Sequence, residues 1–342
     1  MNHRKPLIAA ASVAALLGLS ACSPPVLEVE ESGSHLQSGP DQSGSQSGAQ
    51  SGESSVALTD EQTERIVAEV QAAVDLSDKE KSAEPLAERL VNPALDMRAG
   101  QLTRAEKTST ELAPLIIGNA VHSATVGNSF PRVLVVASEA SGDDPAEVFF
   151  LTQKDAKSDY MLENWARLIG GTPVKGLSVR DGSTVVDGST TGLKVTPSDA
   201  VATYVNFLNN PDNEEYQLFE DNSFEPRYRE ERSALSDAVK VAGTVSTQAR
   251  EWDAPVIGVL LETGNALVSS SFKYTETYTK TVEGSTFELS GTPAAFMDDP
   301  KVDSTVTVDY QVNIFFLIPP EDSDDPIAVV GAERVIQGVK KG

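Results

Sequence analysis

Apolar and polar residues alternate most regularly over residues 305–318. An alternation with a period of two predicts a β-strand that buries one of its two faces. A shift of one residue in its pairing would move the whole apolar set into water, so the register of this strand should be well fixed. We expect the polar positions to face solvent. The apolar positions are Val306, Val308, Tyr310, Val312, Ile314, Phe316 and Ile318, and the polar positions are Thr307, Asp309, Gln311 and Asn313.

Ordered structure is predicted to begin at residue 58 with helices. Thr59 is a suitable N-cap, and Gln62 can complete a capping box with it. Apolar residues then recur at helical spacing on one face. Further helical stretches are expected over residues 82–90 and from Pro93 onward. After residue 110 the period changes, and short β-prone runs predict strands over 115–117, 132–137, 147–153 and 160–169.

The second half of the chain repeats this order. Thr196 can cap a helix that has Pro197 at its first position, and a second helix is expected over about 226–247. A hairpin is expected around Gly264 and Asn265. The predicted strands lie over residues 257–261, 266–281, 287–289, 305–318 and 327–335.

Helices followed by a meander of strands predict an α+β fold with an antiparallel sheet. Because the order occurs twice, we expect two tandem modules, each with helices packed on a curved sheet, similar to the NTF2-like or cystatin-like cone. The first domain is expected over residues 58–180 and the second over 196–342, with a linker at 181–195. Residues 1–21 and 22–57 are expected to precede them as a signal peptide and a tether.

The N-terminal segment has the pattern of an export signal. Arg4 and Lys5 precede an apolar run over residues 6–19, which is too short for a permanent membrane span. Ser20, Ala21 and Cys22 follow it and resemble the lipobox of bacterial lipoproteins. That resemblance implies cleavage between Ala21 and Cys22, with the Cys22 thiol acylated. The chain would then be anchored by lipid in the cell membrane, on the extracytoplasmic side. The alternative is an ordinary secretory signal with a chance cysteine.

Residues 23–57 consist largely of Ser, Gly, Gln, Pro and Glu, with little to bury. A Gln-Ser-Gly tripeptide recurs four times, starting at residues 37, 42, 46 and 50. Low-complexity sequence of this kind predicts a flexible, disordered tether. A coil of this length has an average end-to-end distance of roughly 30–35 Å.

Composition excludes several classes of function. The net charge of −24 argues against nucleic acid as a partner. The chain has one cysteine and three histidines, of which His122 alone follows residues at strand parity, after Ile116, Gly118 and Ala120. This inventory favours neither a zinc site nor a Ser-His-Asp triad, and no phosphate-binding glycine loop is present. We expect no metal site, no cofactor and no catalytic constellation of a known motif.

One set of residues is a tentative pocket. Tyr274, Glu276 and Tyr278 share one face of the predicted strand at 266–281. If that face lines a cone, burial should raise the pKa of Glu276 toward the range that suits acid–base chemistry. In the alternative, Glu276 lies at the strand end in water or pairs with Lys280.

Several segments resemble a family of actinobacterial secreted lipoproteins of unknown function. The resemblance rests on residues 60–66, 89–95 and 224–232, on Arg98, and on residues 264–268. It implies fold, tether and export. Some members carry a glycosyltransferase label, but this chain has no nucleotide-binding α/β pattern to support one.

We therefore predict a lipid-anchored, non-enzymatic binding or scaffolding module of the bacterial cell envelope. Two alternatives remain open. One is a carrier of an apolar lipid or wall-precursor ligand in a cone cavity, and the other is an enzyme with a carboxylate and tyrosine acid–base pocket. The expected partners are the membrane, through the lipid anchor, and an envelope protein or an apolar ligand.

Overall fold

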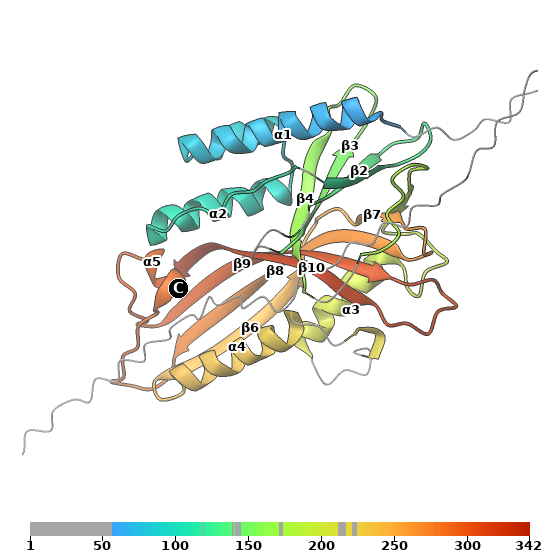
Figure 1. Cartoon of the computed structure of the whole chain (residues 1–342). Helices are drawn as coiled ribbons and strands as arrows, with labels where there is room; N and C mark the ends of the chain where they lie inside the picture. The colour runs from blue at the N-terminus through green and yellow to red at the C-terminus, as the bar shows by residue number, and fades with distance from the viewer. Residues whose placement is uncertain are drawn as a thin grey trace, which may run out of the picture.

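The computed structural model describes residues 57–118, 120–138, 140, 145–170, 174–210, 217–220 and 224–342. Within them, ten strands form one sheet in which all the paired strands are antiparallel (Figure 1). The strand order is β1-β2-β3-β4-β10-β9-β8-β7-β5, and β6 pairs with β8. The fold is α+β with a large antiparallel sheet, as the sequence predicted. The predicted signal peptide, Ala21, Cys22 and almost all of the tether lie outside the described residues.

The N-terminal half contains two long helices and four strands. Thr59 and Gln62 form the predicted capping box, which fixes the start of α1. The predicted second helical stretch is a 3₁₀ helix, and the predicted strand at 115–117 is not a strand in the structure. The elements are α1 (Asp60–Glu80), η1 (Glu84–Glu88), α2 (Ala94–Thr108), β1 (Ala120–Ala124), β2 (Arg132–Ser138), β3 (Glu147–Gln153) and β4 (Met161–Leu168).

The C-terminal half supplies the remaining elements. Thr196 caps α3 with Pro197 in its first turn, as predicted. The predicted run at 287–289 contributes only an isolated bridge between Glu288 and Lys301. The elements are β5 (Thr184–Asp187), α3 (Pro197–Asn209), α4 (Phe224–Val239), β6 (Gly243–Glu251), β7 (Ile257–Leu260), β8 (Ala266–Lys280), α5 (Gly291–Ala295), β9 (Thr305–Ile318) and β10 (Ala328–Lys341).

One predicted helix was too long. The sequence suggested a helix to about residue 247, but α4 ends at Val239 and β6 begins at Gly243. Val245, Thr247 and Ala249 alternate with polar residues on β6, and their β-branched members favour an extended backbone. The apolar spacing of α4 obscured this change of period.

The two halves share the sheet through a short contact between β4 and β10. Gly331 pairs with Leu168, and Ala332 pairs with Arg167. A Cβ atom on Gly331 would lie 3.2 Å from the carbonyl oxygen of Arg167, so the missing side chain permits the close approach. The predicted linker at 181–195 contains β5, which pairs with β7. Tandem NTF2-like modules stay a prediction.

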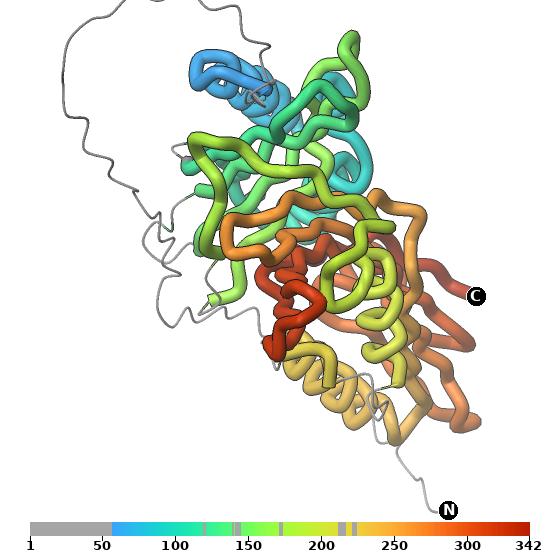
Figure 2. Tube along the Cα trace, turned by 90° about the vertical axis from the view of Figure 1, so that its right-hand side faces the viewer, coloured from blue at the N-terminus to red at the C-terminus, as the bar shows by residue number. Residues whose placement is uncertain are grey.

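The long strands β8 and β9 are covered on both faces. Helices α2 and α4 lie on opposite sides of these strands (Figure 1 and Figure 2). The expectation that the polar face of β9 meets solvent is wrong for Gln311 and Asn313, which are fully buried. Residues of the N-terminal half accept their hydrogen bonds: Gln311 donates to the carbonyl oxygen of Pro93, and Asn313 donates to that of Trp165.

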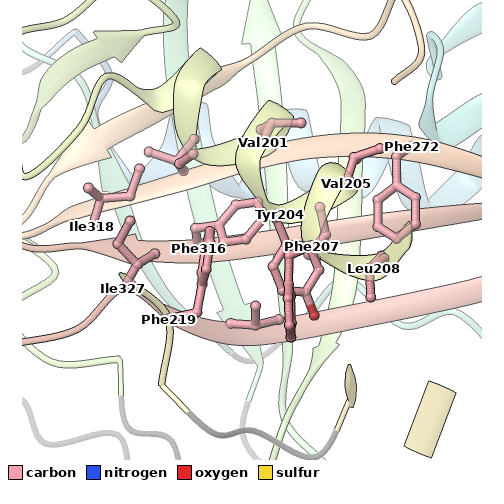
Figure 3. Packing of buried hydrophobic residues seen from close by; sticks show 14 of the residues in the cluster. Val201, Tyr204, Val205, Phe207, Leu208, Phe219, Phe272, Phe316, Ile318 and Ile327 are labelled. Atoms are coloured by element: carbon pink, nitrogen blue, oxygen red, sulfur yellow. The ribbon is translucent and has the colours of Figure 1, made fainter. Parts of the chain in front are cut away.

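Aromatic rings fill the space between α3 and the sheet (Figure 3). Tyr204 of α3 packs edge-on against Phe219 and Phe316, with ring centroids 5.1 and 5.4 Å apart. Edge-to-face contacts of this kind add to the stabilisation from burying the ring area. No helix in the described part of the chain is long and apolar enough to cross a membrane.

Candidate functional site

Tyr274, Glu276 and Tyr278 lie on one face of β8, as the strand period predicted. All three side chains are buried, and Glu276 is only 6% exposed. The Tyr278 hydroxyl donates a hydrogen bond to Oε2 of Glu276 at 2.8 Å. The alternative in which Glu276 meets water is therefore not what the structure shows.

Two further tyrosines complete an aromatic cluster around this strand. Tyr310 of β9 is the register partner of Tyr274, and their rings stack with centroids 4.7 Å apart. Tyr228 of α4 meets the Tyr274 ring edge-on at 5.3 Å. We call Tyr228, Tyr274, Tyr278, Tyr310 and Glu276 the tyrosine cluster. Helix α4 therefore covers the cluster on one side, and β8 and β9 form its other side.

An ion pair closes one side of the tyrosine cluster. Arg334 of β10 donates from Nη1 to Oε2 of Glu231 at 2.5 Å and from Nη2 to Oε1 at 3.3 Å. The same Nη1 also donates to the hydroxyl of Tyr274 at 3.1 Å. A bidentate guanidinium–carboxylate contact fixes direction as well as distance. It therefore ties α4 to β10 beside the hydroxyl of Tyr274, with the guanidinium group 5.7 Å from the ring centroid of Tyr310.

Burial dominates the electrostatics of the tyrosine cluster. It raises the pKa of Glu276, while hydrogen bonds from the side chains of Tyr278 and Tyr310 and the charge of Arg334 oppose the rise. The sequence predicted this direction. Burial also raises the pKa of Tyr228 to about 12. The cluster can hold a proton on a carboxyl group, but the low exposure of Glu276 leaves little access for a substrate.

A surface groove lies beside the cluster, between α4 and β6. Its volume is about 310 Å³. Thr247 in its wall is the register partner of Glu276, so groove and cluster are neighbours on one face of the sheet. The lining residues are Arg229, Arg232, Ser233, Ser236, Val245 and Thr247. We call this feature the α4–β6 groove.

The groove is lined by cations and hydroxyls, with no carboxylate among its lining residues. Arg229 forms an ion pair with Glu225 at 2.5 Å. Arg232 donates to the carbonyl oxygen of Leu208 at 2.8 Å, and its guanidinium lies 5.4 Å from the ring centroid of Tyr228. These contacts hold both guanidinium groups in place, and each retains further donors for a ligand. The arrangement can bind an acceptor-rich, negatively charged group.

The sequence did not predict this groove. The helix expected to residue 247 placed Val245 and Thr247 on the wrong kind of element. The alternation from Gly243 to Glu251 was the available signal for a strand. The position of α4 alongside that strand, in contrast, depends on packing between distant segments.

Other candidate groups do not assemble into a site. The described residues contain no group of three or more His, Cys, Asp or Glu side chains placed to hold a metal ion. His122 lies in β1, and its Nε2 is 3.2 Å from Oδ1 of Asp60. That contact accounts for the imidazole as a structural group.

Comparisons with protein-family models, with curated proteins and with solved structures found no match to this chain. The resemblance to actinobacterial lipoproteins therefore stays a prediction from the sequence.

Proposed function

We propose that this chain is a lipid-anchored extracytoplasmic protein of the bacterial cell envelope that binds a partner and has no catalytic activity of its own. We propose the α4–β6 groove as its binding surface. The observation that carries this assignment is the lining of the groove, which holds two guanidinium groups and three hydroxyl groups, with Glu225 pairing with Arg229 from outside the lining. Such a lining is unusual for a chain with a net charge of −24.

The anchor is proposed from the order of residues at the N-terminus. Ala21 and Cys22 follow a charged segment and a short apolar run. A diacylated cysteine would give stable attachment because two chains hold a protein where one does not. Residues 23–57 would then let the folded body extend roughly 30–35 Å from the membrane surface. An exposed body at that distance suits contact with other components of the envelope.

Binding is favoured over acid–base catalysis because of the position of Glu276. Its carboxyl group is hydrogen-bonded to Tyr278 and packed under α4. A catalytic carboxyl must come within hydrogen-bonding reach of a substrate. The ring packing of the tyrosine cluster leaves this group facing protein side chains.

Binding is also favoured over carriage of an apolar ligand. The two halves are proposed as tandem NTF2-like modules, and a ligand in the second would lie between α3 and the sheet. Tyr204, Phe207, Phe219, Phe272 and Phe316 fill that position with contacting rings (Figure 3). A carrier site would need a cavity there.

Two measurements test the proposal together. Cells are fed a clickable palmitate analogue, and the wild-type chain should be labelled while Cys22→Ser is not. Crosslinked complexes are then recovered with wild type, with the double variant Arg229→Gln/Arg232→Gln and with a tether-only control. The proposal expects a defined envelope partner with wild type that is lost with the double variant. Absence of label would contradict the anchor, and equal recovery from all three proteins would contradict the groove.

A further inference from the structure

Strand β6 has one free edge. It pairs with β8 along its whole length, and within the described residues no other strand pairs with it. Successive residues of an antiparallel strand direct their main-chain groups to alternate edges. Once the direction of the main-chain N–H and C=O groups is known for one residue of β6, it is known for every other residue of the strand.

Two main-chain hydrogen bonds establish which residues face outward. Lys280 donates its N–H to Ser304, away from β6, whereas Thr281 donates its N–H to the carbonyl oxygen of Ala242. Gly243 is the register partner of Lys280, so its main-chain groups also point away from β8. By alternation, Val245, Thr247 and Ala249 present their N–H and C=O groups on the outer edge.

The side chain of Asn209 occupies part of this edge through two hydrogen bonds. The N–H of Ala249 donates to Oδ1 of Asn209 at 2.8 Å, and Nδ2 of Asn209 donates to the carbonyl oxygen of Ala249 at 2.8 Å. The amide of Asn209 thus pairs with Ala249 as a neighbouring strand would. It occupies the edge at that point. The main-chain groups of Val245 and Thr247 have no hydrogen-bond partner within the described residues, although Val245 is half-buried and Thr247 is only 9% exposed.

The open edge and the α4–β6 groove share two residues of β6. Val245 and Thr247 line the groove, and Arg229, Arg232, Ser233 and Ser236 line it from α4. These helix positions recur at intervals of three and four, so they form one stripe of about 10 Å along α4. An added strand would run between this stripe and β6, with every second side chain on the face that meets α4.

We propose that the α4–β6 groove binds an acidic peptide segment of a partner protein, which adds to β6 as a further strand. The peptide exchanges main-chain hydrogen bonds with Val245 and Thr247, and Asn209 limits its length at one end. An acidic side chain on its inner face meets Arg229 and Arg232. This mode combines main-chain pairing for affinity with side-chain contacts for specificity. The inference rests on the proposed function and names the class of its partner.

Two features of the groove favour a peptide over a small anion. The open edge supplies two donors and two acceptors in the spacing of a strand, which a free anion cannot use. The charge is also complementary, since the lining carries two guanidinium groups and no carboxylate. An acidic segment with alternating small polar residues satisfies both features.

The probe is a fluorescein-labelled hexapeptide that alternates glutamate with threonine, followed by fluorescence anisotropy on the folded wild-type protein. Three comparison ligands separate the contributions. In one, lysine replaces glutamate; in another, alternate amides are methylated, which removes main-chain donors and keeps the carboxylates; the third is free glutamate. We expect the parent peptide to bind at least about tenfold more tightly than each of the three, which corresponds to about 1.4 kcal/mol or more.

Two protein variants locate the site. Val245→Pro removes an N–H that points away from β8, so β6 can keep its ladder with β8, and we expect tenfold or greater loss of peptide affinity. Arg229→Gln/Arg232→Gln should weaken binding to a similar extent and reduce its dependence on salt. If Val245→Pro fails to fold by circular dichroism, the methylated peptide still tests the main-chain contacts on wild type.

Equal affinity for the parent and methylated peptides, or absence of peptide binding at millimolar concentration, would overturn the inference. Displacement of the peptide by free glutamate at equal concentration would identify a small-anion site and overturn it as well. Each of these three results is compatible with the proposed function if crosslinking in cells still depends on Arg229 and Arg232. Loss of that dependence would instead remove the proposed function.

Discussion

The two faces of β8 and β9 are both buried, but by different means. On one face, α4 covers the tyrosine cluster with aromatic rings, and a single carboxyl is satisfied by tyrosine hydroxyls. On the other, Gln311 and Asn313 donate to main-chain carbonyl groups of the N-terminal half, and Asn164 of that half donates to the carbonyl oxygen of Ser270 on β8. We call Asn164, Gln311, Asn313 and Gln337 the amide seam. The difference shows that alternation along a strand sorts residues by face but does not reveal what covers each face.

The largest effect is expected from a substitution in the amide seam. Gln311 donates to the carbonyl oxygen of Pro93 and to Oδ1 of Asn313, and it accepts from Gln337. Gln311→Ala would remove three hydrogen bonds of a fully buried side chain, so we expect a loss of about 2–4 kcal/mol in the free energy of unfolding. Urea denaturation followed by tryptophan fluorescence measures it.

Thr307→Ala is the matched control for this substitution. Thr307 shares the strand face of Gln311 but is only half-buried. We expect a change below about 0.5 kcal/mol. A similar loss for both variants would show that the amide seam has no special role.

A buried carboxyl without tyrosine donors gives a sharper contrast with Glu276. Within the described residues, Oε2 of Glu163 has no hydrogen-bond partner, and burial raises the pKa of Glu163 to about 7. Since the unfolded chain releases this proton near pH 4.5, the native state binds more protons between pH 4.5 and 7. The wild type should therefore lose stability as pH rises through that window, by at most about 3 kcal/mol.

Glu163→Gln should remove this pH dependence. Melting temperatures of wild type and variant, measured at pH 5 and pH 8, test the expectation. The variant should be more stable than wild type at pH 8, with a smaller difference at pH 5. Parallel pH profiles for the two proteins would show that Glu163 is not the titrating group.

The smallest effect is expected within the tyrosine cluster. Tyr278→Phe removes one hydrogen bond to Glu276 and keeps the ring, so we expect about 1 kcal/mol of destabilisation. The pKa of Glu276 should rise further because a hydrogen bond that favours its charged form is lost. NMR titration of the Glu276 side-chain carboxyl measures the shift.

A control for this prediction is Tyr160→Phe. The Tyr160 hydroxyl is buried and has no hydrogen-bond partner within the described residues. Its removal should leave the Glu276 pKa unchanged. A downward shift of that pKa in Tyr278→Phe would contradict the assigned hydrogen bond.

The sequence predicted those elements that local patterns determine. Thr59 and Thr196 cap helices because their side chains accept from nearby main-chain N–H groups. Strand β9 was predicted with its observed bounds because its alternation is uninterrupted. The parity of β8 placed Glu276 on one face with Tyr274 and Tyr278 but left open whether that face is buried.

Features that depend on packing between distant segments were not predicted. The burial of Gln311 depends on Pro93, which lies 218 positions away in the chain. The outer edge of β6 depends on Asn209, 40 positions from Ala249. The groove could not be predicted without β6, and the sequence did not predict β6 because the helical spacing of α4 suggested a helix that continued to about residue 247. These contacts involve polar groups whose partners no local pattern identifies.

The central claim is that the α4–β6 groove is a binding surface in the cell. Photo-crosslinking tests it most directly, with benzoylphenylalanine introduced at Ser236, which lines the groove, or at Lys157, an exposed position between β3 and β4. We expect a discrete crosslinked partner from position 236 that disappears when Arg229 and Arg232 are changed to glutamine. No crosslink from position 236, or the same products from both positions, would contradict it.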